Sequence, residues 1–264
     1  MEIFAYSFMI RALIAGLIVA VIAPLIGNFL VMKRFAMISD TLAHVALAGV
    51  AVGLLTETEP VLVTVLLTTL VAILIERLSN LGKMPSETIL ALFMPGGLAV
   101  ALVLINLANG FNSNLFSYLF GSISTVSSSE IYLIAGLGAL VLTAIFAFYE
   151  QLLFTAFDEE GARLKGVKVA RINLLLMVLT ALTVSLTMRV VGALLVSALM
   201  VIPSAAAMRV GRSFKHSFLL SVLFALSAVV LGLLAGFYLN LPAGGAIVLV
   251  SLGIFGGASL VGKK

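Results

Sequence analysis

The chain has no cysteine and no tryptophan, and charged side chains make up only 10% of its 264 residues. Without cysteine, disulfide bonds and thiolate metal sites are excluded, and the redox compartment stays open. Aspartate and histidine are scarce as well, with two of each. Hydrophobic residues account for 62% of the chain, far above the share in soluble globular domains. The composition therefore excludes a soluble protein and predicts an integral membrane protein.

Runs of about 20 apolar residues recur along the whole chain, which is typical of transmembrane helices. We expect an all-α integral membrane protein, a bundle of about 8–9 transmembrane helices in a single domain over residues 1–264. The expected spans are 5–32, 38–55, 60–78, 86–108, 130–149, 172–188, 190–208, 217–238 and 243–261. The boundary between the spans 172–188 and 190–208 is weakly marked, so a broken or re-entrant helix is an alternative there.

Basic residues are concentrated in one alternating set of the loops between these spans. The other set holds the acidic Glu57 and Glu59 and the longer segment 106–129. Because Lys and Arg accumulate in cytoplasmic loops, we expect nine crossings, with the N-terminus outside and the C-terminus in the cytoplasm. The basic residues of the first set are Lys33, Arg34, Arg77, Lys83, Arg163, Lys165, Lys168, Arg171, Arg209, Arg212, Lys215, Lys263 and Lys264.

Asp40 and His44 form the strongest candidate site, at the mouth of the span 38–55. A spacing of four residues places both side chains on one face of a helix. Ionisable groups inside a span are costly and therefore point to function. A carboxylate oxygen with an imidazole nitrogen suits a divalent transition metal. The alternative is a pair at a helix end that caps the span or hydrogen-bonds a neighbour.

The segment 157–167 is the longest charged stretch of the cytoplasmic set, with acidic residues before basic ones. This order suits the dipole of a short helix. One interpretation is a solvated connecting loop, and the other is a helix that binds a cytoplasmic partner. Ala162 and Gly166 are four residues apart, so we expect them to present one small-residue face to that partner.

Two motifs that would indicate enzymatic chemistry are incomplete or absent. Residues 257–264 approach the phosphate-binding G-x-x-x-x-G-K-[ST] pattern, but the final Ser or Thr and the following helix are missing. His-Glu-x-x-His, the zinc peptidase motif, does not occur. We therefore expect neither a nucleotide site nor an enzyme, and no permanently bound cofactor.

With these residues in view, the chain resembles the permease subunits of ABC importers for zinc, manganese and related divalent metals. The similarity extends over essentially the whole chain. One departure is Pro95, where a small polar residue is expected, and which makes the path of that helix uncertain. The blocks that carry the resemblance are 39–53 (SDTLAHVALAGVAVG), 117–122 (SYLFGS), 158–166 (D-x-x-x-A-x-x-x-G), 191–207 (VGALLVSALMVIPSAAA) and 241–244 (LPAG).

The resemblance implies a homodimeric permease around a central pathway, in the cytoplasmic membrane. It implies two copies of a separate cytoplasmic ATPase, an extracytoplasmic metal-binding protein and contact with membrane lipid, and no nucleic acid. The pathway ligands of such permeases carry over to Asp40 and His44. The segment that contacts the ATPase carries over to Asp158, Ala162 and Gly166.

The sequences SDTLAH (39–44) and FDEEGA (157–162) resemble those of zinc permeases more than those of manganese permeases. We therefore expect a zinc importer that uses ATP hydrolysed by a partner subunit, with a manganese or mixed-metal importer as the alternative. A metal transporter driven by an ion gradient is a further alternative, and it would need more buried ionisable groups.

Overall fold

The computed structural model describes residues 7–107, 118–121, 127–239 and 241–262, and every element in them is helical. Eight of the described helices are long and apolar enough to cross a membrane, so the predicted all-α membrane bundle is confirmed. The long helices are α1 (Ser7–Met32), α2 (Met37–Leu55), α3 (Pro60–Asn80), α4 (Ser86–Leu107), α6 (Ser128–Ala147), α9 (Val169–Val191), α11 (Phe214–Leu239) and α12 (Ala243–Val261). The shorter elements are α7 (Tyr149–Phe157), α8 (Glu159–Leu164), the 3-10 turn η2 (Ala193–Leu195) and α10 (Val196–Val210).

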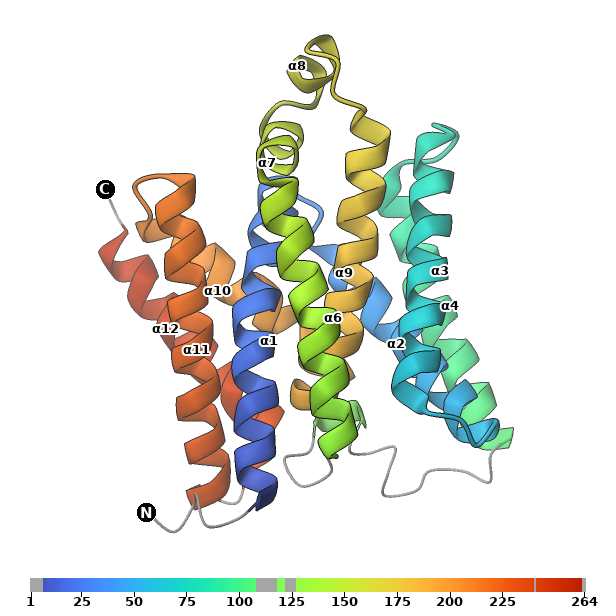
Figure 1. The fold of residues 1–264 in the computed structure, drawn as a ribbon, viewed down its shortest axis with the longest axis vertical. Coiled ribbons are helices and arrows are strands. Elements are labelled where there is room, and N and C mark those ends of the chain that lie inside the picture. Colours follow the sequence, from blue (N-terminus) through green and yellow to red (C-terminus); the bar gives the residue numbers. More distant parts are fainter. Residues whose placement is uncertain (1–6, 108–117, 122–126, 240, 263–264) are drawn as a thin grey trace.

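The long helices lie side by side and run alternately up and down, as Figure 1 shows. The α1–α2, α3–α4 and α10–α11 turns and helix α8 lie toward one end of the bundle, which we call the α8 end. The basic loop residues, including Lys33, Lys83 and Arg212, lie at this end, and Glu57 and Glu59 lie at the other. The bundle thus separates the loop charges as the sequence predicted. Which end faces the cytoplasm stays a prediction.

The expected division between the spans 172–188 and 190–208 lies at Gly192, a few residues beyond its expected position. Helix α9 continues to Val191, and the chain breaks at Gly192, whose φ of +91° favours glycine. A Cβ at Gly192 would collide with the backbone of Phe120 and Gly121, so this glycine also permits a close backbone approach. Helix α10 has only 15 residues, fewer than the ~20 that span a hydrocarbon layer. The structure therefore matches the broken-helix alternative, in which α10 carries the chain back between α9 and α11.

Proline does not break the helices in which it occurs. Pro24, Pro95 and Pro203 lie inside α1, α4 and α10, and each helix continues past them. The path of α4, which Pro95 left uncertain in the sequence, is therefore that of one helix from Ser86 to Leu107. Polar side chains gather around one proline. Asn28 Nδ2 donates a hydrogen bond to the Pro24 carbonyl at 2.7 Å, and Ser204 Oγ donates to the same carbonyl at 2.9 Å. The Ser204 bond joins α10 to α1 at this proline.

Glycine brings neighbouring helices into direct backbone contact. A Cβ at Gly49 would lie 2.7 Å from Thr64 Cα, and one at Gly53 would lie 2.6 Å from Pro60 Cα. These contacts join α2 to α3 within the subunit, as small residues do in membrane bundles. Helices α2 and α9 are the most deeply buried of the eight candidate spans. They form the centre of the bundle, against which the other helices pack.

A buried ion pair holds the end of the bundle opposite α8. Arg189 Nη2 lies 2.7 Å from Glu130 Oε1, and both side chains are about nine-tenths buried. The Arg189 guanidinium also lies over the ring of Tyr118, 4.6 Å from its centroid. Burial raises the pKa of the Tyr118 hydroxyl, which therefore stays neutral beside the ion pair. The pair joins α9, α6 and the segment 118–121 next to the chain break at Gly192.

Replacing Glu130 with alanine should lower the free energy of unfolding by about 3–5 kcal/mol, because Arg189 would remain buried without its counter-charge. Glu130 also accepts a hydrogen bond from Ser127 N in the capping box of α6. Ser127→Ala is therefore the control, and it should cost only about 1 kcal/mol. Denaturant unfolding in detergent measures both variants. Equal losses would mean that the cap, and not the ion pair, stabilises this end.

Candidate functional site

Asp40 and His44 lie on α2, the central helix, and their side chains are half-buried. The residues around them are buried: Ser39 and Thr41 flank Asp40, and Ala43 and Val45 flank His44. The N-cap of α2 is Ala36, and no side chain caps this helix. Within the part of the chain that the structure describes, the side chains of Asp40 and His44 make no hydrogen bond and no ion pair. Their role as metal ligands stays a prediction.

The surroundings of the pair favour an ionised Asp40 but do not complete a metal site. Asp40 lies in the first turn of α2, where the helix dipole stabilises a carboxylate. Helix α2 packs against α3, α4, α9 and α10. The described residues contain no group of three or more His, Cys, Asp or Glu side chains that could hold a metal ion. Water or a second copy of the chain must therefore supply the remaining ligands of any four-coordinate ion.

An apolar cavity adjoins α2 one turn beyond His44. The cavity has a volume of about 460 Å³, lies between α2, α3 and α4, and is lined by residues that include Val45 and Ala48 but neither Asp40 nor His44. Ala48 is four residues beyond His44 and therefore lies on the same face of α2 as the pair. The cavity offers no ligand for a metal ion, because its wall is apolar.

The segment 158–166 forms a compact local structure around the short helix α8. Asp158 caps the helix, accepting a hydrogen bond from Gly161 N at 2.9 Å. Gly166 has a φ of +81° just after the helix, where it reverses the chain. Ala162 is completely buried. The expected small-residue face of Ala162 and Gly166 is therefore wrong for Ala162, which anchors α8 to its own subunit.

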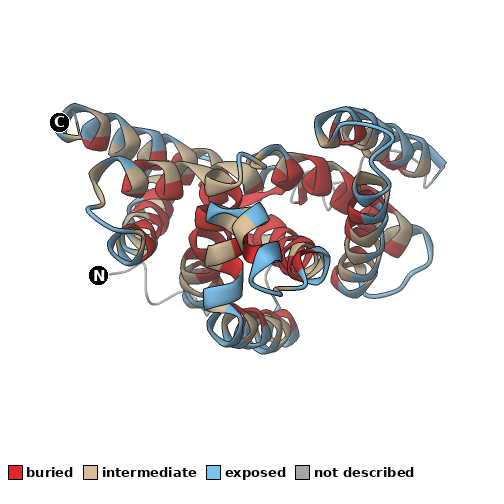
Figure 2. Cartoon of the chain, turned by 90° about the horizontal axis from the view of Figure 1, so that it is seen from above, coloured by how far each residue is buried: buried red, intermediate tan, exposed pale blue. Residues whose placement is uncertain are grey.

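Two large apolar side chains flank α8 on its exposed side. Phe157 is 81% exposed and Leu164 is 89% exposed. Helix α8 protrudes beyond the ends of the long helices in Figure 1. Figure 2 looks onto this end and shows exposed residues on the nearest elements, with buried residues concentrated in the middle of the array. Phe157 and Leu164, and not Ala162, are therefore the exposed apolar side chains at α8.

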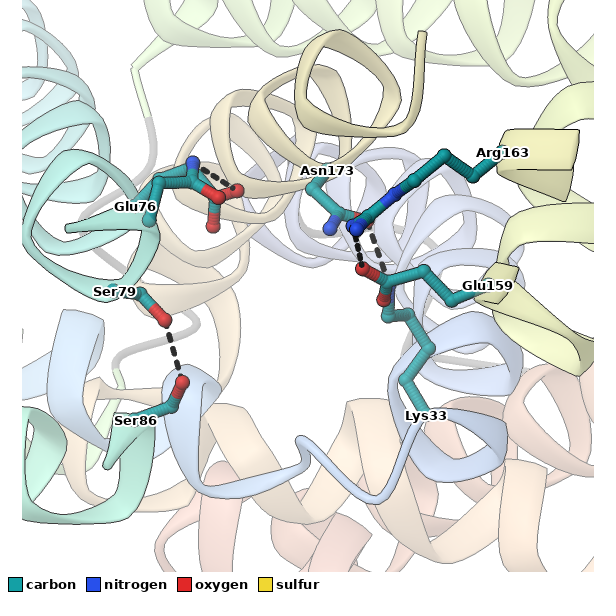
Figure 3. A network of polar contacts seen from close by, with 8 residues as sticks. Lys33, Glu76, Ser79, Ser86, Glu159, Arg163 and Asn173 are labelled. Carbon is teal, nitrogen blue, oxygen red and sulfur yellow. Dashed lines mark hydrogen bonds and ion pairs between the residues drawn. The ribbon is translucent and has the colours of Figure 1, made fainter. Parts of the chain in front are cut away.

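Sequence reasoning missed a polar network that ties α8 to the body of the protein (Figure 3). Lys33 Nζ donates to Asn173 Oδ1 at 2.6 Å and lies 3.5 Å from Glu159 Oε2. Glu159 is the first residue of α8, and Lys33 lies in the turn between α1 and α2. The same region holds Glu76 of α3, which is 5% exposed. The signal for Glu76 was present in the sequence, because it is a lone carboxylate inside the expected span 60–78.

Comparison with known proteins identifies the family. The model of the ABC 3 transport family matches residues 5–262. The chain belongs to this family. It is 30% identical over 251 residues to the high-affinity zinc uptake system membrane protein ZnuB of Haemophilus influenzae, covering 95% of this chain and 96% of the relative. It is 32% identical over 250 residues to the manganese import system permease protein ScaB of Streptococcus gordonii, covering 95% and 90%.

A solved structure supports the same conclusion about the fold. A chain of PsaBC from Streptococcus pneumoniae in complex with Fab superposes with a TM-score of 0.88 at 31% identity, covering 97% of this chain and 92% of that chain. The chain is therefore the multi-pass permease subunit of a metal ABC importer, a transport component without an ATPase domain of its own. The alternative of an ion-driven secondary transporter is wrong.

The backbone of Gly166 provides a test of the coupling segment. A Cβ at Gly166 would meet open space, but φ of +81° is strained for most side chains. Gly166→Leu should therefore distort the end of α8 and impair transport. Gly166→Asn should be close to wild type, because asparagine tolerates this conformation. Uptake and co-purification of the ATPase measure both. Equal impairment by Asn and Leu would show that a partner approaches Gly166 too closely for any side chain.

Proposed function

We propose that this permease imports zinc, and that Asp40 and His44 bind the ion within the pathway. The observation that carries the proposal is the half-buried pair on α2, which has no partner among the described residues. A carboxylate and an imidazole that remain unsatisfied inside a membrane bundle are costly unless a cation binds them. The amino-acid sequences of the SDTLAH and FDEEGA segments support zinc over manganese as the cargo.

The proposed site is weak when one subunit acts alone. Zinc in proteins has four ligands, and one subunit provides Asp40 and His44. We propose a homodimer in which a two-fold axis brings both pairs to one central ion, giving two carboxylates and two imidazoles. In the alternative arrangement each subunit holds its own ion, with water as the other ligands. Manganese remains the second candidate cargo, since carboxylate oxygen suits it as well as imidazole suits zinc.

The remaining partners follow from the two ends of the bundle. We propose that two copies of a cytoplasmic ATPase bind the α8 end through the segment 158–166, with Phe157 and Leu164 as apolar contacts. Exposed apolar residues of this size are typical of contact surfaces. The basic loops at this end support a cytoplasmic location, which places the N-terminus outside and the C-terminus in the cytoplasm. An extracytoplasmic metal-binding protein then delivers zinc to the opposite end.

Asp40→Asn and His44→Ala should each reduce zinc uptake by at least about tenfold, because each removes a metal ligand. His216→Ala is the matched control, since His216 is an exposed histidine at the start of α11. Zinc uptake into vesicles containing the complete transporter measures the effect at equal protein amounts. Normal uptake by both site variants would exclude the proposed ligands.

The number of bound ions distinguishes the two arrangements of the site. A site shared across the two-fold axis should bind one zinc ion per two subunits. Separate sites should bind two ions per dimer. Metal analysis of the purified, dialysed complex measures this ratio, with the variant containing both Asp40→Asn and His44→Ala as the blank. A ratio of two ions per dimer above the blank would rule out the shared site.

A further inference from the structure

A polar cavity lies at the α8 end of the bundle, apart from the Asp40–His44 pair. Its volume is about 320 Å³. The α1–α2 turn, α3, α4, α8 and α9 all contribute to its wall. The charged residues that line it are Lys33, Glu76 and Glu159. Two carboxylates and one ammonium leave the wall with one net negative charge, which favours a cation.

Glu76 is the least satisfied charged group of this wall. Glu76 belongs to α3, and its side chain is buried. Asn80, one turn later, donates a hydrogen bond from Nδ2 to Glu76 Oε1 at 3.0 Å. No ion pair involves Glu76 among the residues that the structure describes. Removing a carboxylate from water is expensive unless a positive charge compensates for it. Glu76 therefore lacks the direct counter-charge that its burial calls for.

Lys33 does not provide this counter-charge by direct contact. Its ammonium is held by Asn173 Oδ1 and lies near Glu159 Oε2, on the side of the cavity across from Glu76 in Figure 3. Glu159 is also 3.4 Å from Arg163 Nη2. The positive charges in this region thus gather around Glu159 and leave Glu76 facing the cavity.

We propose that this cavity is a second, transient site for the transported divalent cation, with the Glu76 carboxylate as its principal ligand. The proposal rests on the proposed function. Phe35 of the α1–α2 turn lines the cavity, and Asp40 lies in the first turn of the helix that follows. Asp40 is three residues beyond Met37, a rise of about 4.5 Å along the helix. The cavity therefore lies next to the turn from which α2, the helix that carries Asp40, begins.

The chemistry of the wall fits a site that releases its ion readily. Besides the carboxylates it offers amide and hydroxyl oxygens, including the Ser79 and Ser86 hydroxyl groups, which lie 2.5 Å apart. Oxygen ligands suit hard cations such as Mn²⁺, and a single direct carboxylate gives weak binding. A transport pathway needs sites that bind strongly enough to admit an ion and weakly enough to let it go. The ammonium of Lys33 opposes tight binding in the same cavity.

The test uses Mn²⁺ as the probe and the purified complex of the permease with its ATPase. Asp40→Asn and His44→Ala together remove the first site, and electron paramagnetic resonance then measures the Mn²⁺ that remains bound. We expect bound Mn²⁺ in this background, and Glu76→Gln should weaken that binding by at least about tenfold. Glu150→Gln, which alters an exposed carboxylate of α7, should leave it unchanged. The proposal would be overturned if the double variant bound no Mn²⁺, or if Glu76→Gln left its affinity for Mn²⁺ unchanged.

Lys33→Gln provides an independent test, because a purely structural role of the network would not predict tighter Mn²⁺ binding in this variant. Removing the ammonium should tighten Mn²⁺ binding in the same background, because the opposing charge is gone. Weaker binding in Lys33→Gln would contradict the site even if Glu76→Gln failed to fold. Zinc and manganese uptake by the wild-type complex separates the two proposals. If neither metal is transported, the proposed function is wrong. If transport is normal but Glu76→Gln does not change Mn²⁺ binding, only the second site is wrong.

Discussion

The hydrocarbon layer offers no hydrogen bonds, so a polar group inside this bundle must find its partner within the protein. The hydroxyl groups of α9 follow this constraint, because Thr180, Thr183 and Thr187 each donate to the carbonyl four residues earlier. Asn28 follows it by binding the Pro24 carbonyl and the Ser221 hydroxyl. The packing of the central helices depends on this internal pairing, which leaves few polar groups over.

Among the groups outside this pairing are three that a cation could use. Asp40 and His44 have no partner among the described residues, and Glu76 has only Asn80. Each would be costly if it were permanently bare, since a buried charge is stable only when it is compensated. The three residues lie on α2 and α3, in the half of the bundle nearer to α8.

The segment 158–166 illustrates how a short motif can act through local structure. In D-x-x-x-A-x-x-x-G the aspartate caps α8, the alanine anchors it and the glycine ends it. The contact between Glu159 and Lys33 then joins α8 to the turn that precedes α2. A movement of α8 imposed by an ATPase would therefore reach the helix that carries Asp40 through one turn of chain. Such a two-state movement is what links distant sites in a transporter.

The sequence by itself determined the class of the fold, and it singled out Asp40 and His44 as the candidate pair of the first proposed site. Its apolar runs are local signals, and each candidate membrane helix in the structure corresponds to one of them. The spacing of Asp40 and His44 is equally local, since a helix fixes the relation of residues four apart. The structure also has the predicted separation of basic and acidic loops, because this separation depends only on the order of the spans.

The tertiary structure decided what depends on contacts between distant segments. Gly192, and not the segment 187–189, breaks α9, because the backbone of Phe120 and Gly121 lies against that glycine. Ala162 is buried and Phe157 exposed, which depends on how α8 folds back onto its own subunit. The cavity around Glu76 brings together residues from five parts of the chain. No periodicity within one helix contains that information, since it arises only when the helices pack.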